Sequence, residues 1–315
     1  MTVSTVDPIV ARAKRGSPLR GFLQDWLPRL VLAPSFALVL VFVYGFNLWT
    51  VVLSFTNSKA FTNLNFVGWL NYRRLWNWTF EYDPPSNWYT ALVNMGLFGA
   101  LYVAFCLGLG LTLAILLDQK IRGEGLLRPI YLYPLALSFI VTGTAWKLFL
   151  DPRIGLEKAM HEWGWTSFHF DWVVNPRMMI YCVAIAAIWQ TSGFVMAMFL
   201  AGLRGIDGEI LKAAQIDGAS AFATYRRIVI PMLRPVFLSA IIVLTGMALK
   251  SYDLVLSVTG KNPGGAAELP STFMYSYTFT RNQMAVGSAS AVVMLMTIAA
   301  IMVPYLYSEL REKAR

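Results

Sequence analysis

The chain has 315 residues, of which 57% are hydrophobic and only 14% are charged, and its mean hydropathy is +0.55. That composition excludes an ordinary soluble domain and predicts an all-α protein that crosses a membrane several times. A net charge of +9 is also typical of nucleic-acid-binding proteins, so the positions of the basic residues must decide between nucleic acid and membrane topology. Cys106 and Cys182 both fall in apolar segments, where we expect them to pack as small apolar side chains without a disulfide.

Six segments are long and apolar enough to cross a hydrocarbon core of about 30 Å, which takes about 20 helical residues. The first is too long for the apolar region of a signal peptide and lacks a small-residue cleavage pattern, so we interpret it as an uncleaved span. We therefore expect a transmembrane domain over residues 30–307, after an N-terminal segment of residues 1–29 and before a tail of residues 308–315. The predicted spans are residues 30–55, 89–117, 129–150, 178–203, 235–258 and 285–307.

Lysine and arginine gather on alternate sides of these spans. Sixteen lie in the N-terminal segment, in the connections after the second and fourth spans and in the tail, whereas eight lie in the other three connections. Cytoplasmic connections carry the excess of Lys and Arg in membrane proteins, so both termini are predicted to be cytoplasmic. Topology thus accounts for the positive charge, and no nucleic-acid partner is expected.

The connections predicted to lie outside are rich in aromatic residues, as in "GWLNYRRLWNWTFEYDPPSNWY" from Gly68 and "HEWGWTSFHFDWVVNP" from His161. Two interpretations remain open, an interfacial belt of Trp and Tyr and a docking surface for an external partner. His161 and His169 are eight residues apart with no cysteine nearby, so their spacing predicts no metal site.

The sequence contains no motif for catalysis. There is no phosphate-binding loop, since the glycine-rich "TGKNPGG" from Thr259 has the wrong spacing, and no zinc-protease or nucleophile-elbow pattern. We therefore expect no catalytic residue, no metal and no cofactor in this chain. It is not expected to hydrolyse ATP by itself.

The connection 204–234 reads "RGIDGEILKAAQIDGASAFATYRRIVIPMLR" and predicts two short helices. Asp207 can cap the first, Glu209 suits its first turn, and Gly218 ends it. Ala213 and Ala214 give that helix a small-residue patch. A second helix from about residue 219 puts residues 222, 225 and 229 on one face, and Pro231 stops it. The alternatives are a hairpin that lies on the membrane surface and a docking element for a cytoplasmic partner.

The spacing of small and apolar residues in this connection resembles the "EAA" loop of permease subunits in bacterial ATP-binding-cassette (ABC) importers, and "AAQIDGA" is similar to the sugar-importing branch. The resemblance implies the type I ABC importer permease fold and a coupling helix that inserts into a cleft of an ATPase subunit. Lys212 stands where the family usually has Glu, which puts a salt bridge carried by that Glu in doubt. The implied coupling residues are Glu209, Lys212, Ala213, Ala214, Asp217 and Gly218.

The resemblance extends over most of the chain. "SYDLVLSVTGKNPGG" from Ser251 and "VGSASAVVMLM" from Val286 resemble maltose and glycerol-phosphate type permeases, and "IAAIWQTSGFVMAMFLAGLRGID" from Ile185 is similar to glucose and mannose type permeases. This implies a multi-pass subunit of the bacterial inner membrane that forms half of a sugar pathway, with a monosaccharide such as glucose or mannose as substrate. The implied partners are a second permease subunit, membrane lipid, a periplasmic sugar-binding protein and an ABC ATPase dimer that binds ATP and Mg.

Two polar groups within the spans are candidates for the sugar pathway, because intramembrane polar groups usually mark such pathways. Gln190 lies near the middle of the fourth predicted span with Trp189 and Ser192 beside it, although it can also serve only to hydrogen-bond a neighbouring helix. The second group is Lys250, Tyr252 and Asp253, in which the two charged residues can instead form a structural ion pair on one helix.

Other functions remain open at this point. The same family carries disaccharides, glucosides and polyols. A secondary transporter driven by an ion gradient would show broken spans in both halves of the chain, and a receptor-like membrane scaffold would leave the intramembrane polar groups without a transport role.

Overall fold

The computed structural model of the chain describes residues 18–76, 87–119, 123–260 and 267–313. Helices dominate these ranges, in which the only strand-like pairing is an isolated antiparallel bridge between Thr56 and Phe66. The predicted all-helical membrane fold is thereby confirmed. The chain divides into two compact units, Met1–Val52 and Leu53–Arg315.

The first unit is a long apolar helix. It runs through α1 (Pro18–Val39), a π-helical turn η1 (Leu40–Gly45) and most of α2 (Phe46–Ser54). The stretch Arg29–Ser54 is long and apolar enough to cross a membrane and matches the predicted first span. Its large apolar side chains, such as Phe36 and Leu48, are exposed, as in a helix that meets lipid or another subunit.

The second unit is built around α4 (Trp88–Asp118) and α8 (Met179–Arg204), which pack along one another. Residues at every fourth position of α4 lie on one helix face and are buried, because that spacing nearly completes a turn. Gly110 belongs to this face, and a Cβ there would lie 2.7 Å from the Val195 side chain, so α8 comes close to the α4 backbone. The buried side chains of this face are Phe98, Tyr102, Cys106 and Ala114.

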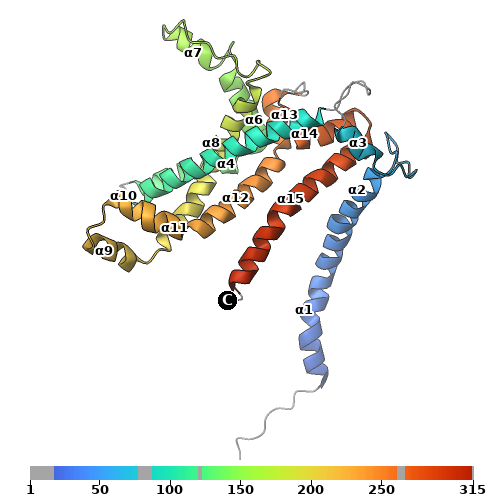
Figure 1. Ribbon diagram of the computed structural model, residues 1–315, viewed down its shortest axis with the longest axis horizontal. Helices are drawn as coiled ribbons and strands as arrows, with labels where there is room; N and C mark the ends of the chain where they lie inside the picture. Colours follow the sequence, from blue (N-terminus) through green and yellow to red (C-terminus); the bar gives the residue numbers. More distant parts are fainter. Residues whose placement is uncertain (1–17, 77–86, 120–122, 261–266, 314–315) are drawn as a thin grey trace, which may run out of the picture. The chain divides into compact units, whose positions relative to one another are not determined.

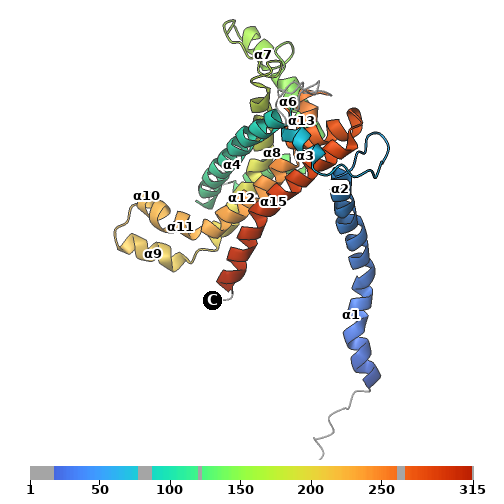
Figure 2. The ribbon, with the colours of Figure 1, turned by 45° about the vertical axis from the view of Figure 1, so that its right-hand side comes forward.

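Helix α12 (Arg234–Leu249) completes this core by packing against both α4 and α8. It buries Ala240, Leu244 and Ala248, again at a spacing of four. Figures 1 and 2 show α4, α8 and α12 running together through the body of this unit.

The third predicted span is not one straight helix, so the prediction of a continuous helix over residues 129–150 is wrong. It consists of α5 (Glu124–Leu132), a short 3₁₀ turn η2 (Tyr133–Ala136) and α6 (Phe139–Leu150), and the two halves meet at 100°. Pro134 has no N–H for a helical bond. Ser138 then caps α6 by accepting a hydrogen bond from the Ile140 N–H at 3.2 Å, which starts a new helix in a new direction.

The fifth predicted span is also broken. The segment α10 (Ala221–Thr224), η3 (Tyr225–Val229) and α11 (Ile230–Met232) meets α12 at 63°. Pro231 lies inside α11, so its predicted role as a helix stop is wrong, and the bend comes at Leu233. The helix ends again at Leu249 before α13 (Tyr252–Thr259). Four helices in the described ranges are long enough to cross a membrane, or up to six if each bent pair is one span.

The remaining helices of this unit form a second core at one end. They are α3 (Leu70–Trp76), α14 (Pro270–Tyr275), the π-helical turn η4 (Ser276–Thr280) and α15 (Met284–Lys313). Trp88 packs on Phe273 with ring centroids 5.1 Å apart. Helix α7 (Leu156–Glu162) lies toward this end, whereas α9 (Gly208–Ile216), α10 and the last turn of α15 lie toward the other (Figures 1 and 2).

Candidate functional site

The 204–234 segment forms a helical hairpin, as the sequence predicts. The Asp207 side chain caps α9 by accepting a hydrogen bond from the Glu209 N–H at 3.0 Å. Gly218 ends the helix with φ +75°, and the Gly218 and Ala219 N–H groups donate to the carbonyls of Gln215 and Ala214 at 3.1 and 3.0 Å. This pair of bonds is the Schellman motif, which favours glycine because its left-handed residue needs no Cβ. Both ends of α9 are therefore fixed by local hydrogen bonds.

The hairpin presents an apolar crown away from the body of the unit. Ile216 is 86% exposed and Phe222 is 74% exposed, as is typical of a surface that another protein or the membrane covers. Ala213 is exposed beside them, whereas Ala214 is buried. The two alanines therefore do not form one outward patch as predicted, because adjacent helical positions lie on different faces. Ala213 belongs to the outer surface, and Ala214 seats α9 on the protein.

The second helix of the hairpin differs from the expectation that residues 222, 225 and 229 share a face. Phe222 is exposed, Tyr225 is half-buried and Val229 is buried. The π-turn η3 is the reason, since the Ile230 N–H donates to the Tyr225 carbonyl five residues earlier and changes the helical register. Because of this register change, Phe222 lies on the outer surface of the hairpin.

Lys212, the departure from the family pattern, has a partner within its own helix. Its Nζ lies 2.9 Å from Glu209 Oε1, and both side chains are more than two-thirds exposed. An exposed pair of this kind adds little stability. The pair neutralises the charges of Lys212 and Glu209 within α9. Asp217 and Gly218 are also exposed on the same hairpin.

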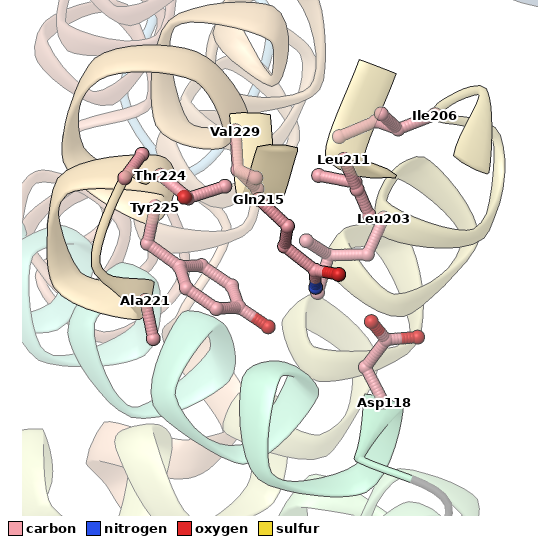
Figure 3. Close-up of a pocket in the computed structure, with 10 residues that line it drawn as sticks. Asp118, Leu203, Ile206, Leu211, Gln215, Ala221, Thr224, Tyr225 and Val229 are labelled. Carbon is pink, nitrogen blue, oxygen red and sulfur yellow. The ribbon is translucent and has the colours of Figure 1, made fainter. Parts of the chain in front are cut away.

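A pocket of about 220 Å³ lies between the hairpin and the ends of α4 and α8. Figure 3 shows the Tyr225 ring, the Gln215 amide and the Asp118 carboxylate projecting into it. Arg204, the last residue of α8, lies 3.9 Å from Asp118 and also pairs with Glu124 at the start of α5. One guanidinium thus joins the ends of α4, α5 and α8 at the residue where the hairpin segment begins.

A second, shallow pocket of about 260 Å³ lies where the bent α5–α6 span meets α8. We call it the aromatic pocket. Trp146 and Trp189 form its wall with ring centroids 5.8 Å apart, and the buried Thr142 contributes the hydroxyl group. Of these residues, Trp189 was predicted from the sequence as a pathway residue and Thr142 and Trp146 were not, although a hydroxyl four residues before a Trp on a predicted span was a usable signal. The other lining residues are Leu137, Val141, Ala145 and Phe149.

Gln190 lies next to this pocket and is 2% exposed. Its Nε2 donates to the Leu137 carbonyl at 2.8 Å, in the break between η2 and α6, so Gln190 ties α8 to the bend of the neighbouring span. Its Oε1 is nevertheless buried without a hydrogen-bond partner in the described chain, and so is the Thr142 hydroxyl. Buried polar atoms are rarely left unpaired, so these two acceptors are suited to groups that the chain itself does not supply.

Residues near Gln190 also correct the sequence interpretation. Gly193 could loosen a helix, yet α8 is continuous there. A Cβ at Gly193 would overlap the Tyr131 carbonyl oxygen, so the glycine instead lets the α5 backbone approach. Ser192 is half-buried, and its hydroxyl lies 3.5 Å from the Trp189 carbonyl, a weak contact.

The Lys250, Tyr252 and Asp253 group lies at the break between α12 and α13, and none of the three lines the aromatic pocket. Lys250 and Asp253 are exposed, and no ion pair joins them in the described chain. The expected pairing requires both on one helix, and α12 ends before Lys250. Tyr252 instead packs on Tyr275 with ring centroids 4.6 Å apart.

Residues 9–312 match the family described as binding-protein-dependent transport system inner membrane component. The chain belongs to this family. Among its relatives, the permease is 39% identical over 280 residues to a probable ABC transporter permease protein of Pyrococcus horikoshii, with 88% of this chain and 94% of the relative covered. It is 32% identical to a xylose/arabinose import permease of Haloferax volcanii, with 88% and 86% covered. It is 30% identical to a trehalose/maltose transport system permease of Thermococcus litoralis, with 88% and 91% covered.

The fold of this permease is also that of a solved structure. It superposes on a chain from a bacterial ABC transporter involved in the import of the acidic polysaccharide alginate with a TM-score of 0.78, over 93% of this chain and 98% of the other, at 18% identity. The expected importer-permease fold is therefore confirmed.

Proposed function

We propose that this permease is one of two permease subunits of an ATP-driven, binding-protein-dependent sugar importer in a bacterial inner membrane, and that it forms half of the translocation pathway. Membership of the permease family supports this, as do relatives named for xylose, arabinose, trehalose and maltose. Both termini are cytoplasmic in this proposal, and the end of α15 lies toward the same end of the unit as the hairpin (Figures 1 and 2).

The hairpin is the element that couples ATP hydrolysis to transport. The exposure of its large apolar side chains is the observation that carries the proposal. Its apolar crown, which consists of the exposed side chains of Ile216 and Phe222, with Ala213 between charged groups, is suited to insertion into a cleft of an ATPase. The Arg204 contacts beneath it give a route by which movement of the hairpin reaches α4, α5 and α8. In this scheme Glu209, Lys212, Asp217 and Gly218 shape the exposed surface, and Ala214 seats it.

The chain itself performs no chemistry in this scheme. ATP and Mg are bound by a dimer of partner ATPase subunits, and a second permease completes the pathway. A periplasmic sugar-binding protein delivers the substrate, which is supported by a neighbouring structure of the alginate transporter in complex with its periplasmic protein.

The aromatic pocket is our proposed sugar contact, and a monosaccharide such as glucose or mannose is the proposed substrate. Trp146 and Trp189 offer apolar faces to a sugar ring. The buried Thr142 hydroxyl and the Gln190 Oε1 behind the pocket accept hydrogen bonds from sugar hydroxyls once a movement of the spans exposes them. The similarity of the stretch from Ile185 to glucose and mannose type permeases supports the choice of a monosaccharide. Lys250, Tyr252, Asp253 and Ser192 are proposed as polar lining elsewhere on the path.

A secondary transporter would also contain bent spans, and the bends of 100° and 63° lie in different halves of the chain. The family match favours ATP coupling over that alternative. A disaccharide, glucoside or polyol remains an alternative substrate within the same family, to be separated by a panel of sugars presented on the cognate binding protein.

The coupling proposal is tested by the ATPase activity of the purified assembly, with and without sugar-loaded binding protein. Ile216→Glu places a charge in the apolar crown and is expected to abolish most of the stimulation, because a charge buried without a partner strongly weakens an interface. Ile216→Met keeps the apolar character and is expected to retain it. Equal stimulation in both variants would contradict a docked crown.

The sugar contact is tested by uptake measurements. Trp189→Ala is expected to reduce uptake strongly, whereas Trp189→Phe keeps a ring face and retains most of it. If Trp189→Ala transports normally while the Ile216 variants behave as expected, the pocket assignment is wrong and the coupling assignment stands.

A further inference from the structure

Three side chains in the connection between α6 and α8 come together although the sequence separates them. Glu157 and His161 stand four residues apart on α7 and so share a helix face. His169 returns to this face from the following segment, and one potential ligand atom from each residue lies within 4.8 Å of the others. The spacing of the two histidines alone predicted no metal site. The fold adds the Glu157 carboxylate to them.

Backbone contacts orient both ligands on α7. His161 Nε2 lies 2.8 Å from the Phe168 carbonyl, and a carbonyl can only accept, so Nε2 carries the proton and Nδ1 keeps its lone pair. Glu157 Oε2 accepts the Phe170 N–H at 3.1 Å, and Oε1 faces the His169 ring. Hydrogen bonds of this type, from the second nitrogen of the imidazole to a carbonyl, are the usual support of a metal-binding histidine.

Charge favours a cation at the same place. The Phe170 N–H bond and the neighbouring His169 hold the pKa of the Glu157 carboxyl below its usual range, so it is the ionised, ligating form that is present. His169 Nδ1 lies 3.3 Å from Glu157 Oε1, and its side chain is 78% exposed, so the ring is free to turn toward an ion.

We propose that Glu157, His161 and His169 form a binding site for a divalent transition-metal cation, with Zn²⁺ as the preferred ion. Two imidazole nitrogens and one carboxylate oxygen are a zinc ligand set, and bonds of about 2.0–2.2 Å require only that the ligand atoms close by about 1–1.5 Å. Rotation of the exposed His169 ring supplies much of that closure, and water completes a tetrahedral shell. The bound ion ties α7 to the segment around residues 168–170 and fixes the exposed Trp163 and Trp165 between them.

The test is a Zn²⁺ titration of the purified full-length permease in its complex, free of affinity tags, against a chromophoric chelator. We expect one Zn²⁺ per chain with saturation, and a loss of affinity of about a hundredfold or more in Glu157→Gln, His161→Ala and His169→Ala, since even supporting residues contribute about 10–100-fold. Glu162→Gln is the matched control, because it removes an exposed carboxylate from the same helix that pairs only with Lys158. It is expected to leave the affinity unchanged.

Co²⁺ in place of Zn²⁺ gives an independent readout, since its visible spectrum reports a low-coordinate site with nitrogen ligands. Mg²⁺ and Ca²⁺ are expected not to compete, because they prefer shells of oxygen. Absence of saturable Zn²⁺ binding at micromolar concentration would overturn the proposal. Stoichiometric binding that persists when all three ligands are replaced would overturn it as well.

Discussion

Gly218→Ala is the sharpest perturbation of the hairpin that the structure offers. Gly218 has φ +75°, where an L residue with a Cβ is disfavoured by about 1–2 kcal/mol. No atom lies within 4 Å of the position of that Cβ, so the whole effect is backbone strain and not a steric clash. A change of 1–2 kcal/mol reduces the population of the closed turn by about 5–30-fold.

The matched control is Gly208→Ala, at the first residue of α9. Its added Cβ also meets no atom within 4 Å, but its backbone is helical, so alanine is expected to be neutral or stabilising by up to about 1 kcal/mol. Asparagine tolerates the left-handed region, so Gly218→Asn is expected to lie between the two.

Hydrogen exchange at the Ala219 amide, which donates to Ala214, reads out the turn directly. Gly218→Ala is expected to speed that exchange by about 5–30-fold and to lower the stimulated ATPase activity, while Gly208→Ala changes neither. Equal exchange and equal ATPase activity in the two variants would refute the role assigned to the left-handed turn.

Four further substitutions test the packing and the buried polar groups. Thr142→Val replaces an unpaired buried hydroxyl by an apolar group of similar shape, so it is expected to raise the free energy of unfolding by about 1 kcal/mol while lowering sugar uptake. Gly193→Ala is expected to lower the free energy of unfolding by several kcal/mol, because its Cβ meets the Tyr131 backbone. Gly246→Ala, with open space around it in α12, is expected to raise the free energy of unfolding by about 0.5–1 kcal/mol. Burial raises the pKa of Glu268, so its protonated form favours the fold and stability is lost as pH rises through the folded pKa. Relative to Glu268→Gln, the native chain is therefore expected to gain stability as pH falls from neutral toward 4.5, as measured by thermal unfolding across that range.

Local signals allowed most of the fold to be predicted. The first, second, fourth and last spans begin within one or two residues of their predicted positions, because a long apolar run needs no tertiary information. The hairpin was predicted for the same reason, since the Asp207 cap and the Gly218 turn are properties of short stretches. The Ser220 side chain caps α10, a local signal that the sequence analysis did not use.

The bends were missed because hydropathy measures length and polarity, and neither changes at a bend within an apolar run. Pro134 followed by Ser138 was the usable signal for the first, since a residue without an N–H precedes a helix cap there. The register change at Tyr225 had no equally clear signal.

The aromatic pocket and the Glu157 cluster depend on contacts between distant segments. Trp146 and Trp189 belong to different spans, and the segment that holds His169 meets α7 through hydrogen bonds of the Phe168 and Phe170 backbone to α7 side chains. A single sequence carries the residue types of such sites but not the pairing of the elements that hold them.

The most direct test of the proposed function is sugar uptake into proteoliposomes that contain this permease, its partner permease and the ATPase dimer, with sugar-loaded binding protein outside. ATP enclosed in the vesicles is expected to drive accumulation that stops when the ATPase or the binding protein is left out, and an imposed ion gradient alone is expected to drive none. Accumulation by this chain alone under an ion gradient, without ATP, would contradict the proposal.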